Sequence, residues 1–297
     1  MNSNFSTYSI PTSQGNISIW DSQGIGKPVL FIHGNSACKE SFSKQFETNL
    51  PQQYRFIAID LPGHGNSDKA KDRENTYTIS GYADVAIEVI KSLALDKPVV
   101  VGWSLGGHIG LNMLQKAQKL AGLLITGTPP IKISSEGFQE GFLPLPLFQT
   151  LFKKIEFSRS EANEFMSGGG FDTQKYPFIV DAALKTDGYA RHHLVESMSK
   201  GVGGNQKEIV EIDDTPLCVV QGKNDLGINN KYITENVNYK NLFNKKVYII
   251  DHSGHAVFWE KPEEFNDILS LFLSKILTED GMHSKALSQG CTKKICC

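Results

Sequence analysis

A glycine-flanked serine motif, placed between a buried strand and a helix, constrains the fold of this chain most strongly. The motif at Gly102–Gly106 reads GWSLG; it follows the apolar run of Pro98–Gly102, and the helical segment Leu105–Gln118 continues from it. A serine in such a tight turn needs residues almost without side chains two positions before and after it, and the outer glycines meet this need. The turn lifts Ser104 Oγ above the end of the sheet, beside helix N–H groups that favour negative charge. Ser104 is therefore the candidate nucleophile.

Short apolar runs alternate with helical segments along most of the chain. Uninterrupted runs of about five β-branched and apolar residues predict central parallel strands that are covered on both faces. We expect strands at Asn16–Trp20, Val29–His33, Arg55–Asp60, Pro98–Gly102, Leu123–Thr126, Leu217–Gln221 and Lys246–Asp251. Helices are expected at Tyr82–Leu93, Leu105–Gln118 and Pro262–Leu277. The sequence thus predicts an α/β protein with a mostly parallel central sheet flanked by helices.

The alternation breaks between residues 129 and 213, which contain helix-like pieces and no convincing buried strand. We interpret 129–213 as an inserted helical cap over the carboxyl edge of the sheet, and residues 1–128 and 214–277 as the core. Gly168–Gly170 and Gly201–Gly204 are candidate hinges of this cap. Residues 278–297 lose the apolar periodicity, and we expect them to form a disordered tail.

A serine nucleophile needs a histidine base, which we expect just after the last strand. Of the eight histidines, only His252 and His255 lie there. His255 is the better candidate, because the preceding Gly254 permits a loop that points the imidazole inward. The supporting acid is expected after the preceding strand, where Asp225 is the only acid of the loop Gly222–Asp225. Asp225 would hold the tautomer of His255, which would remove the proton from Ser104.

Two backbone N–H groups are expected to stabilise the charge that develops on a substrate carbonyl. We assign this oxyanion hole to Asn35, in the loop after a buried strand, and to Leu105, which follows the nucleophile. His33, in the same loop as Asn35, is interpreted as structural and hydrogen-bonded within the loop. The chemistry requires no metal and no organic cofactor.

Charge and targeting features exclude several classes of partner. The formal net charge is −2 with no sustained basic stripe, so a nucleic-acid partner is not expected. The N-terminus lacks the pattern of a secretory signal and no apolar run could span a membrane, so we expect a cytoplasmic protein. Cys38 and Cys218 are expected to be reduced. The three remaining cysteines, Cys291, Cys296 and Cys297, are assigned to the tail, with lipidation or metal binding left open.

The stretch Asp60–Ser67 (DLPGHGNS) resembles a motif found across the α/β-hydrolase superfamily. Together with the segments HGN, GWSLGG, GKND and SGH, it identifies the chain as a member of that superfamily and implies an inserted cap on an α/β-hydrolase fold. Haloalkane dehalogenases and epoxide hydrolases of this fold use an aspartate nucleophile, so Ser104 argues against both activities.

Further segments look like the AidH type of N-acyl-homoserine lactone lactonase. They lie at Ser80–Asp84, Gly102–Gly110, Ile125–Pro130, Thr186–Gly188 and Gly203–Val210. The resemblance runs from about Tyr8 to Leu277 and is thin across Ile131–Gly170. It implies that Ser104, Asp225 and His255 open the lactone ring of quorum-sensing signals, with Asn35 and Leu105 at the oxyanion hole.

Two positions depart from that family's pattern. Its acid is glutamate where this chain has Asp225, and its cap presents a tyrosine to the ligand where the counterpart here is Phe165. Trp103, Phe142 and Phe165 are the residues that we expect to contact the substrate. The segment Phe138–Phe152 is rich in Phe and Leu, and either lines an acyl-chain pocket or packs as an ordinary helix on the core.

Three functions follow from these patterns. The first is a lactonase for N-acyl-homoserine lactones. The second is a carboxylesterase, or another hydrolase of C–C or C–N bonds, that uses the same three residues. The third is a ligand receptor that kept the fold and lost turnover. The expected partner is a small-molecule ester or lactone substrate. The sequence does not fix the oligomeric state.

Overall fold

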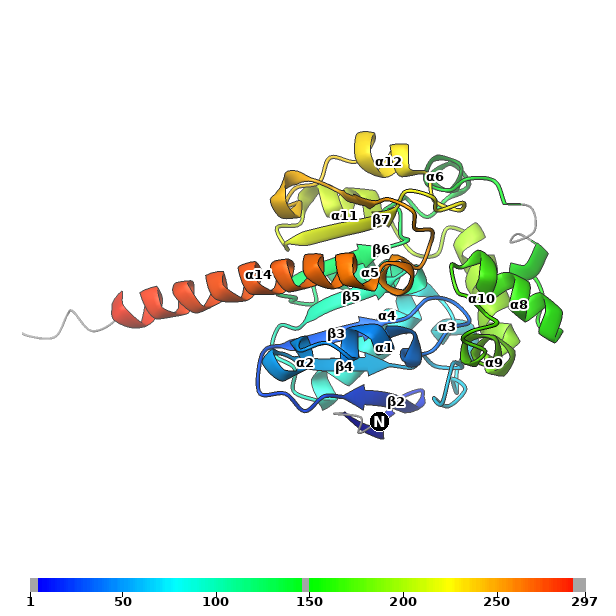
Figure 1. The fold of residues 1–297 in the computed structure, drawn as a ribbon, viewed down its shortest axis with the longest axis horizontal. Coiled ribbons are helices and arrows are strands. Elements are labelled where there is room, and N and C mark those ends of the chain that lie inside the picture. Colours follow the sequence, from blue (N-terminus) through cyan, green and yellow to red (C-terminus); the bar gives the residue numbers. More distant parts are fainter. Residues whose placement is uncertain (1–4, 146–149, 291–297) are drawn as a thin grey trace, which may run out of the picture.

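An eight-stranded sheet forms the centre of the computed structural model, which describes residues 5–145 and 150–290 (Figure 1). The strands are β1 Ser6–Thr12, β2 Gly15–Asp21, β3 Pro28–Ile32, β4 Arg55–Ile59, β5 Val99–Trp103, β6 Gly122–Thr126, β7 Leu217–Gly222 and β8 Tyr248–Ile250. Their spatial order is β1-β2-β4-β3-β5-β6-β7-β8. β2 pairs antiparallel with β1 and β4, and the other neighbours pair in parallel. The predicted fold, a mostly parallel sheet flanked by helices, is confirmed.

Helices cover both faces of the sheet, so alternate residues of the central strands enter two separate cores. Leu30 and Ile32 of β3 belong to one core, and Val29 and Phe31 to the other. This two-sided burial explains why the strand appears in the sequence as an unbroken apolar run. The first face is covered mainly by α4 (Ile79–Ser92) and α5 (Leu105–Gln115). The second is covered by η1 (Lys39–Phe42), α1 (Ser43–Phe46), α2 (Leu50–Gln53), α13 (Val257–Glu260) and α14 (Pro262–Gly290).

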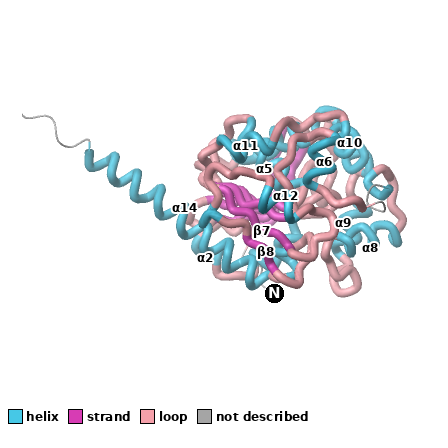
Figure 2. Tube along the Cα trace, turned by 90° about the horizontal axis from the view of Figure 1, so that it is seen from above, coloured by secondary structure: helices cyan, strands magenta, loops and turns pink. Residues whose placement is uncertain are grey.

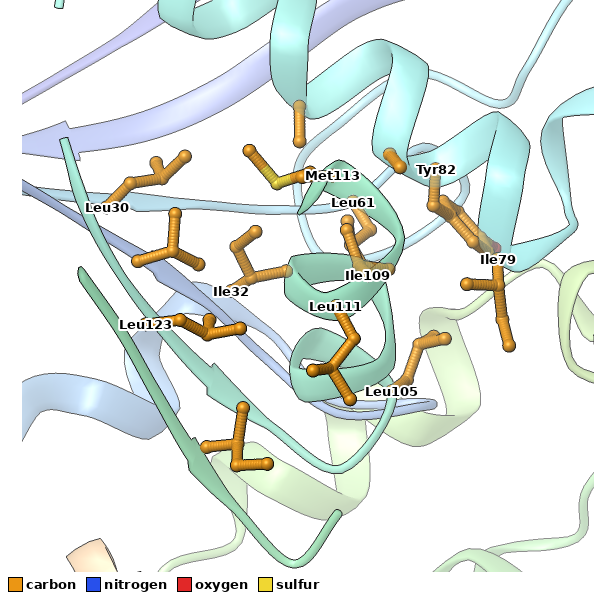
Figure 3. Close-up of a cluster of buried hydrophobic side chains, with 14 of the residues drawn as sticks. Leu30, Ile32, Leu61, Ile79, Tyr82, Leu105, Ile109, Leu111, Met113 and Leu123 are labelled. Carbon is orange, nitrogen blue, oxygen red and sulfur yellow. The ribbon is translucent and has the colours of Figure 1, made fainter. Parts of the chain in front are cut away.

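The helix that follows Ser104 is packed into the first core. Figure 3 shows its Leu105, Ile109 and Met113 among side chains of the sheet and of α4. All of these residues are at most 4% exposed. The helix that begins directly after Ser104 is therefore anchored in the core by buried apolar side chains. The other labelled members of the cluster are Leu30, Ile32, Leu61, Ile79, Tyr82, Leu111 and Leu123.

The predicted cap region contains helices and no named strand among its described residues. Its helices are α6 Ser135–Gly141, α8 Arg159–Gly168, α9 Phe178–Lys185, α10 Gly188–Ser199 and α11 Gln206–Ile212. Figure 1 shows α8, α9 and α10 grouped together at one end of the molecule. α11 packs instead against α5, and α6 packs against α12 (Asn230–Glu235). Within the predicted cap 129–213, the helices that are grouped away from the sheet are therefore α8, α9 and α10.

Charged and polar contacts tie this group of helices to the core. The Arg73 guanidinium of α3 (Arg73–Thr76) donates to both oxygens of Asp187, at 2.6 and 2.7 Å. Asp187 caps the start of α10, and its backbone N–H donates to Gly63 O at 2.8 Å. Arg191 on α10 donates to Ser36 Oγ at 3.0 Å, in the loop that follows β3. The helices of the cap are therefore seated next to the strand ends.

Two elements differ from the prediction, and some of the residues named in the sequence analysis lie outside the described part of the chain. β1 has no predicted counterpart. The last helix, α14, continues to Gly290 where the sequence predicts an end at Leu277 and a disordered tail from 278, and it extends away from the rest of the molecule (Figure 2). Cys291, Cys296, Cys297 and part of the segment Phe138–Phe152 lie outside the described residues. Among the described helices, none is long and apolar enough to cross a membrane.

Candidate active site

The carboxyl ends of β3, β5 and β6 lie level with one another. Ile32 pairs with Gly102, and Gly102 pairs with Ile125. The loops that begin at His33, Ser104 and Gly127 therefore start side by side at one edge of the sheet. This is where a parallel sheet places its ligand site.

Ser104 occupies a strained turn between β5 and α5. Its φ is 52° and its ψ is −114°, a backbone conformation that L-residues rarely adopt. A Cβ atom on Gly102 would lie 2.4 Å from Gly106 O, and one on Gly106 would lie 1.9 Å from Ile32 O. Neither position has room for a side chain, so both glycines are required by packing. The turn is further fixed by the Ser104 N–H, which donates to Thr126 O at 2.9 Å.

Asp225 and His255 form a hydrogen-bonded pair beside this turn. The distance between His255 Nδ1 and Asp225 Oδ2 is 2.8 Å. An ionised carboxylate only accepts, so Nδ1 must carry the proton and Nε2 is the basic nitrogen. Burial raises the pKa of the Asp225 carboxyl, but the charge and hydrogen bond of His255 outweigh this and the net pKa is lowered. Burial lowers the pKa of His255, but Asp225 raises it above the ordinary value.

Asp225 accepts three further hydrogen bonds from its surroundings. Its Oδ1 accepts from the N–H groups of Gly227 and Ile228, at 2.9 and 3.2 Å. Its Oδ2 also accepts from Gln221 Nε2 at 2.8 Å, while Gln221 Oε1 accepts from Gly127 N–H at 3.0 Å. Gln221 is 1% exposed and links the acid to the loop after β6. Sequence reasoning missed it, because its position in an apolar strand gives no sign of a polar role.

Backbone hydrogen bonds join the loop that carries Asp225 to the loop that carries His255. Asn224 N–H donates to Ser253 O at 2.8 Å, and Lys223 N–H donates to Ile250 O at 2.9 Å. A Cβ atom on Gly127 would lie 2.8 Å from His255 Cε1, which places the imidazole over the loop after β6. Among the described residues no hydrogen bond joins Ser104 Oγ to His255. Such catalytic bonds are often long without substrate and tighten in the complex.

The two predicted oxyanion-hole residues flank the turn. Leu105 is the first residue of α5, and Asn35 lies in the loop after β3. Within the described part of the chain, neither backbone N–H donates to a protein acceptor. The Asn35 side chain accepts from Ser36 Oγ at 3.0 Å. Free N–H groups at these two positions are what stabilisation of an oxyanion requires.

The three predicted substrate contacts lie at different depths. Trp103 is 3% exposed, and its indole N–H donates to His255 O at 3.1 Å, so it supports the base loop from below. This placement differs from the predicted substrate contact. Phe142 is half-buried and its ring centroid lies 6.2 Å from that of His108. Phe165 is 5% exposed and packs between Phe152 and Phe157 in the cap.

His33 is structural, as expected from its loop. Its Nδ1 lies 2.7 Å from Gly34 O, and its Nε2 accepts from Leu61 N–H at 3.1 Å. Both ring nitrogens are thus occupied by the backbone, and the ring is fully buried. Among the described residues no group of His, Cys, Asp and Glu could hold a metal ion.

Comparisons with known proteins agree with this geometry. The family model for the alpha/beta hydrolase fold matches residues 27–153. An AidH N-acyl homoserine lactonase mutant complexed with N-hexanoyl homoserine is 36% identical, with 92% of this chain and 97% of that chain covered and a TM-score of 0.86. A second AidH mutant, complexed with N-hexanoyl homoserine lactone, is 36% identical over 92% of this chain and 99% of that chain, with a TM-score of 0.85.

More distant relatives share the architecture with other activities. The 2-hydroxy-6-oxo-6-(2'-aminophenyl)hexa-2,4-dienoic acid hydrolase of Metapseudomonas resinovorans is 26% identical over 85% of this chain and 86% of its own length. The esterase EaEST from Exiguobacterium antarcticum is 20% identical, with 91% of this chain and 100% of that chain covered and a TM-score of 0.73, a likeness of fold alone. With 36% identity to a lactonase of this fold over nearly the whole of both chains, the protein belongs to the α/β-hydrolase superfamily.

Proposed function

We propose that this hydrolase opens the lactone ring of N-acyl-homoserine lactones, and thereby quenches quorum-sensing signals, through an acyl-enzyme on Ser104. The observation that carries the proposal is the strained Ser104 turn next to the His255–Asp225 pair, in a chain that is 36% identical to AidH. The fold alone would not identify the substrate, because one fold hosts many activities.

The mechanism follows from the direction of the hydrogen bonds. Ser104 Oγ attacks the lactone carbonyl carbon while His255 Nε2 accepts the hydroxyl proton, and Asp225 stabilises the imidazolium. The N–H groups of Asn35 and Leu105 donate hydrogen bonds to the carbonyl oxygen as it becomes negatively charged. The ring C–O bond then breaks, and His255 returns the proton to the leaving alkoxide. That hydroxyl remains part of the acyl group, which stays bound to Ser104 Oγ until water, activated by His255, hydrolyses this ester and releases the product as a carboxylate.

A half-buried aromatic position supports an apolar subsite for the acyl chain. Phe142 packs on Phe138 with ring centroids 5.4 Å apart, and lies next to His108 on α5. Burial lowers the pKa of His108 to about 4, so this histidine is neutral at physiological pH and puts no charge next to Phe142. Phe142 and the cap residue Phe165 are thus the proposed contacts of the acyl chain.

The runner-up is a carboxylesterase that uses the same three residues. One cap residue favours this function. Phe165 stands where a tyrosine is expected in the lactonase family, and it has no hydroxyl with which to bind a ligand. Its ring packs against those of Phe152 and Phe157. A substrate that relies on a polar contact at this point would bind less well.

Mass spectrometry of N-hexanoyl-homoserine lactone after incubation with the enzyme separates these functions. A lactonase adds one water to the substrate and leaves the acyl amide intact. The Ser104→Ala variant should leave the whole substrate unchanged. Release of free homoserine lactone would instead reveal an acylase. If the lactone stays unchanged while a simple aryl ester is hydrolysed in a Ser104-dependent manner, the protein is a carboxylesterase and the lactonase proposal is wrong.

A further inference from the structure

A carboxylate outside the serine, aspartate and histidine set holds the loop of the base. Glu260 is the last residue of α13 and turns back onto the segment that precedes this helix. Its Oε1 accepts from Gly254 N–H at 3.0 Å and from Ala256 N–H at 3.2 Å, and its Oε2 accepts from Gly254 N–H at 2.9 Å. Gly254 and Ala256 are the two neighbours of His255 in the chain. One side chain therefore binds the backbone on both sides of the base.

Other contacts hold the same loop at different points: Asn224 N–H donates to Ser253 O at 2.8 Å, and Ser253 Oγ donates to Ile250 O at 3.1 Å. His255 lies between β8 and α13, outside regular secondary structure, and its own carbonyl accepts from the Trp103 indole. Because the amides on either side of His255 are bound to one carboxylate, the direction of its Cα–Cβ bond is tied to the position of Glu260. A general base must point within hydrogen-bond reach of the nucleophile, so this direction matters for the reaction.

The cap covers this carboxylate. Gly170, in the loop after α8, has a φ of +93°, and a Cβ atom built on it would lie 2.4 Å from Glu260 Oε1. The same atom would lie 3.0 Å from Ala256 N. The carboxylate is thus enclosed between the base loop and a cap residue that has no side chain. The titratable groups that act on it are Asp225 and His255, and the cap residue adds no charge.

We propose that Glu260 is a positioning residue, which fixes the imidazole of His255 by binding the backbone amides on both sides of it. The proposal rests on the proposed serine chemistry, because it assigns Glu260 a role through the base of that reaction. Glu260 touches neither the nucleophile nor the substrate and is not itself catalytic. Its negative charge has a second effect, since it adds to that of Asp225 in raising the pKa of His255.

Two variants separate position from charge. In Glu260→Gln the amide oxygen can still accept from both backbone N–H groups, but the charge is gone and an NH₂ group replaces the second acceptor of the Gly254 N–H. In Glu260→Ala both the acceptor and the charge are gone. Glu263→Gln is the matched control, because Glu263 is exposed in the first turn of α14 and the change in charge is the same.

The experiment combines a titration with a kinetic measurement on the full chain. NMR of histidine-labelled protein measures the pKa of the His255 ring without any turnover. The signal of His255 is identified as the one that is missing in His255→Ala. We expect the pKa of His255 to fall in Glu260→Gln and to stay unchanged in Glu263→Gln. The limiting rate at which a fluorophosphonate modifies Ser104, measured above the pKa of His255, should fall by up to about 100-fold in Glu260→Ala and much less in Glu260→Gln.

Failure of this proposal is distinct from failure of the lactonase proposal, since neither readout uses a lactone. A wild-type limiting rate in folded Glu260→Ala overturns the positioning role. If Glu260→Ala does not fold, the limiting rate of Glu260→Gln decides: a rate close to that of the wild type supports a role through backbone position, and a loss of about 100-fold overturns it, because the amide oxygen still binds the backbone. If the wild type is not modified at all, the serine chemistry on which the proposal rests has failed. An unshifted pKa of His255 in Glu260→Gln refutes the effect of the charge.

Discussion

Replacement of Asp225 by Asn should invert the tautomer of the base. In the wild type, Asp225 Oδ1 accepts from the N–H groups of Gly227 and Ile228, whereas Oδ2 faces His255 Nδ1 and Gln221 Nε2. An Asn side chain keeps its oxygen at the two backbone donors, because its NH₂ group would repel them. The NH₂ group then faces His255 Nδ1 and donates to it.

This arrangement moves the ring proton to Nε2, where it prevents His255 from accepting the proton of Ser104. The loss expected for a wrong tautomer is on the order of 10⁴-fold in kcat, or about 5 kcal/mol of transition-state stabilisation. The new NH₂ group also opposes the donor of Gln221, which cannot turn because its oxygen accepts from Gly127. We therefore expect a loss of about 1–3 kcal/mol in the free energy of unfolding as well.

The assay is steady-state hydrolysis of an aryl ester, with urea unfolding to show that the variant is folded. Asp251→Asn is the matched control: the Asp251 side chain is 64% exposed and pairs only with Lys223 among the described residues, so its activity should match the wild type. If folded Asp225→Asn keeps more than about a tenth of the wild-type kcat, the derivation from the tautomer is refuted, and the acid of the reaction must be sought elsewhere.

Three further outcomes follow from the structure. Gly106→Ala should lower the free energy of unfolding by about 1–3 kcal/mol or more and abolish turnover, because its Cβ would lie 1.9 Å from Ile32 O; wild-type stability in urea would contradict this. Lys39→Ala should cost about 3–5 kcal/mol in the same assay, because Lys39 Nζ binds the fully buried Asp60 at 2.7 Å, and a cost below about 1 kcal/mol would speak against it. Because Asp225 raises the pKa of His255 above the ordinary 6.5 and the base must be neutral, kcat/KM should be lost as the pH falls, with a midpoint above 6.5; a lower midpoint in the pH profile would contradict the pairing.

The sequence predicted the elements whose signal is local. The strand before Ser104 is an unbroken apolar run because both of its faces are buried. The glycines around the serine form a local motif, although the clash that requires Gly106 is with Ile32 O of the neighbouring strand. β1 escaped prediction, because it lies at the edge of the sheet and its segment Ser6–Thr12 contains a proline and mostly polar residues. The extension of α14 beyond Leu277 escaped as well, since helix formers such as Glu, Ala, Lys and Leu can continue a helix without an apolar stripe.

The roles of residues that depend on contacts in the folded protein could not be predicted from the sequence. Gln221 gains its role only when the loop after β6 meets the loop of Asp225. Glu260 acts on backbone amides four and six residues before it, but no short motif marks it. Trp103 was predicted to contact the substrate. Strand alternation points its side chain away from Ser104 and under the His255 loop, where it is 3% exposed.

The assignment of Ser104 as the nucleophile is tested most directly by the reaction of the protein with a fluorophosphonate at neutral pH, followed by peptide mass mapping. We expect one adduct, on the peptide that contains Ser104, which forms slowly in His255→Ala and not at all in Ser104→Ala. No adduct on the folded wild type, or an adduct on another serine that persists in Ser104→Ala, would contradict the assignment of Ser104 as the nucleophile.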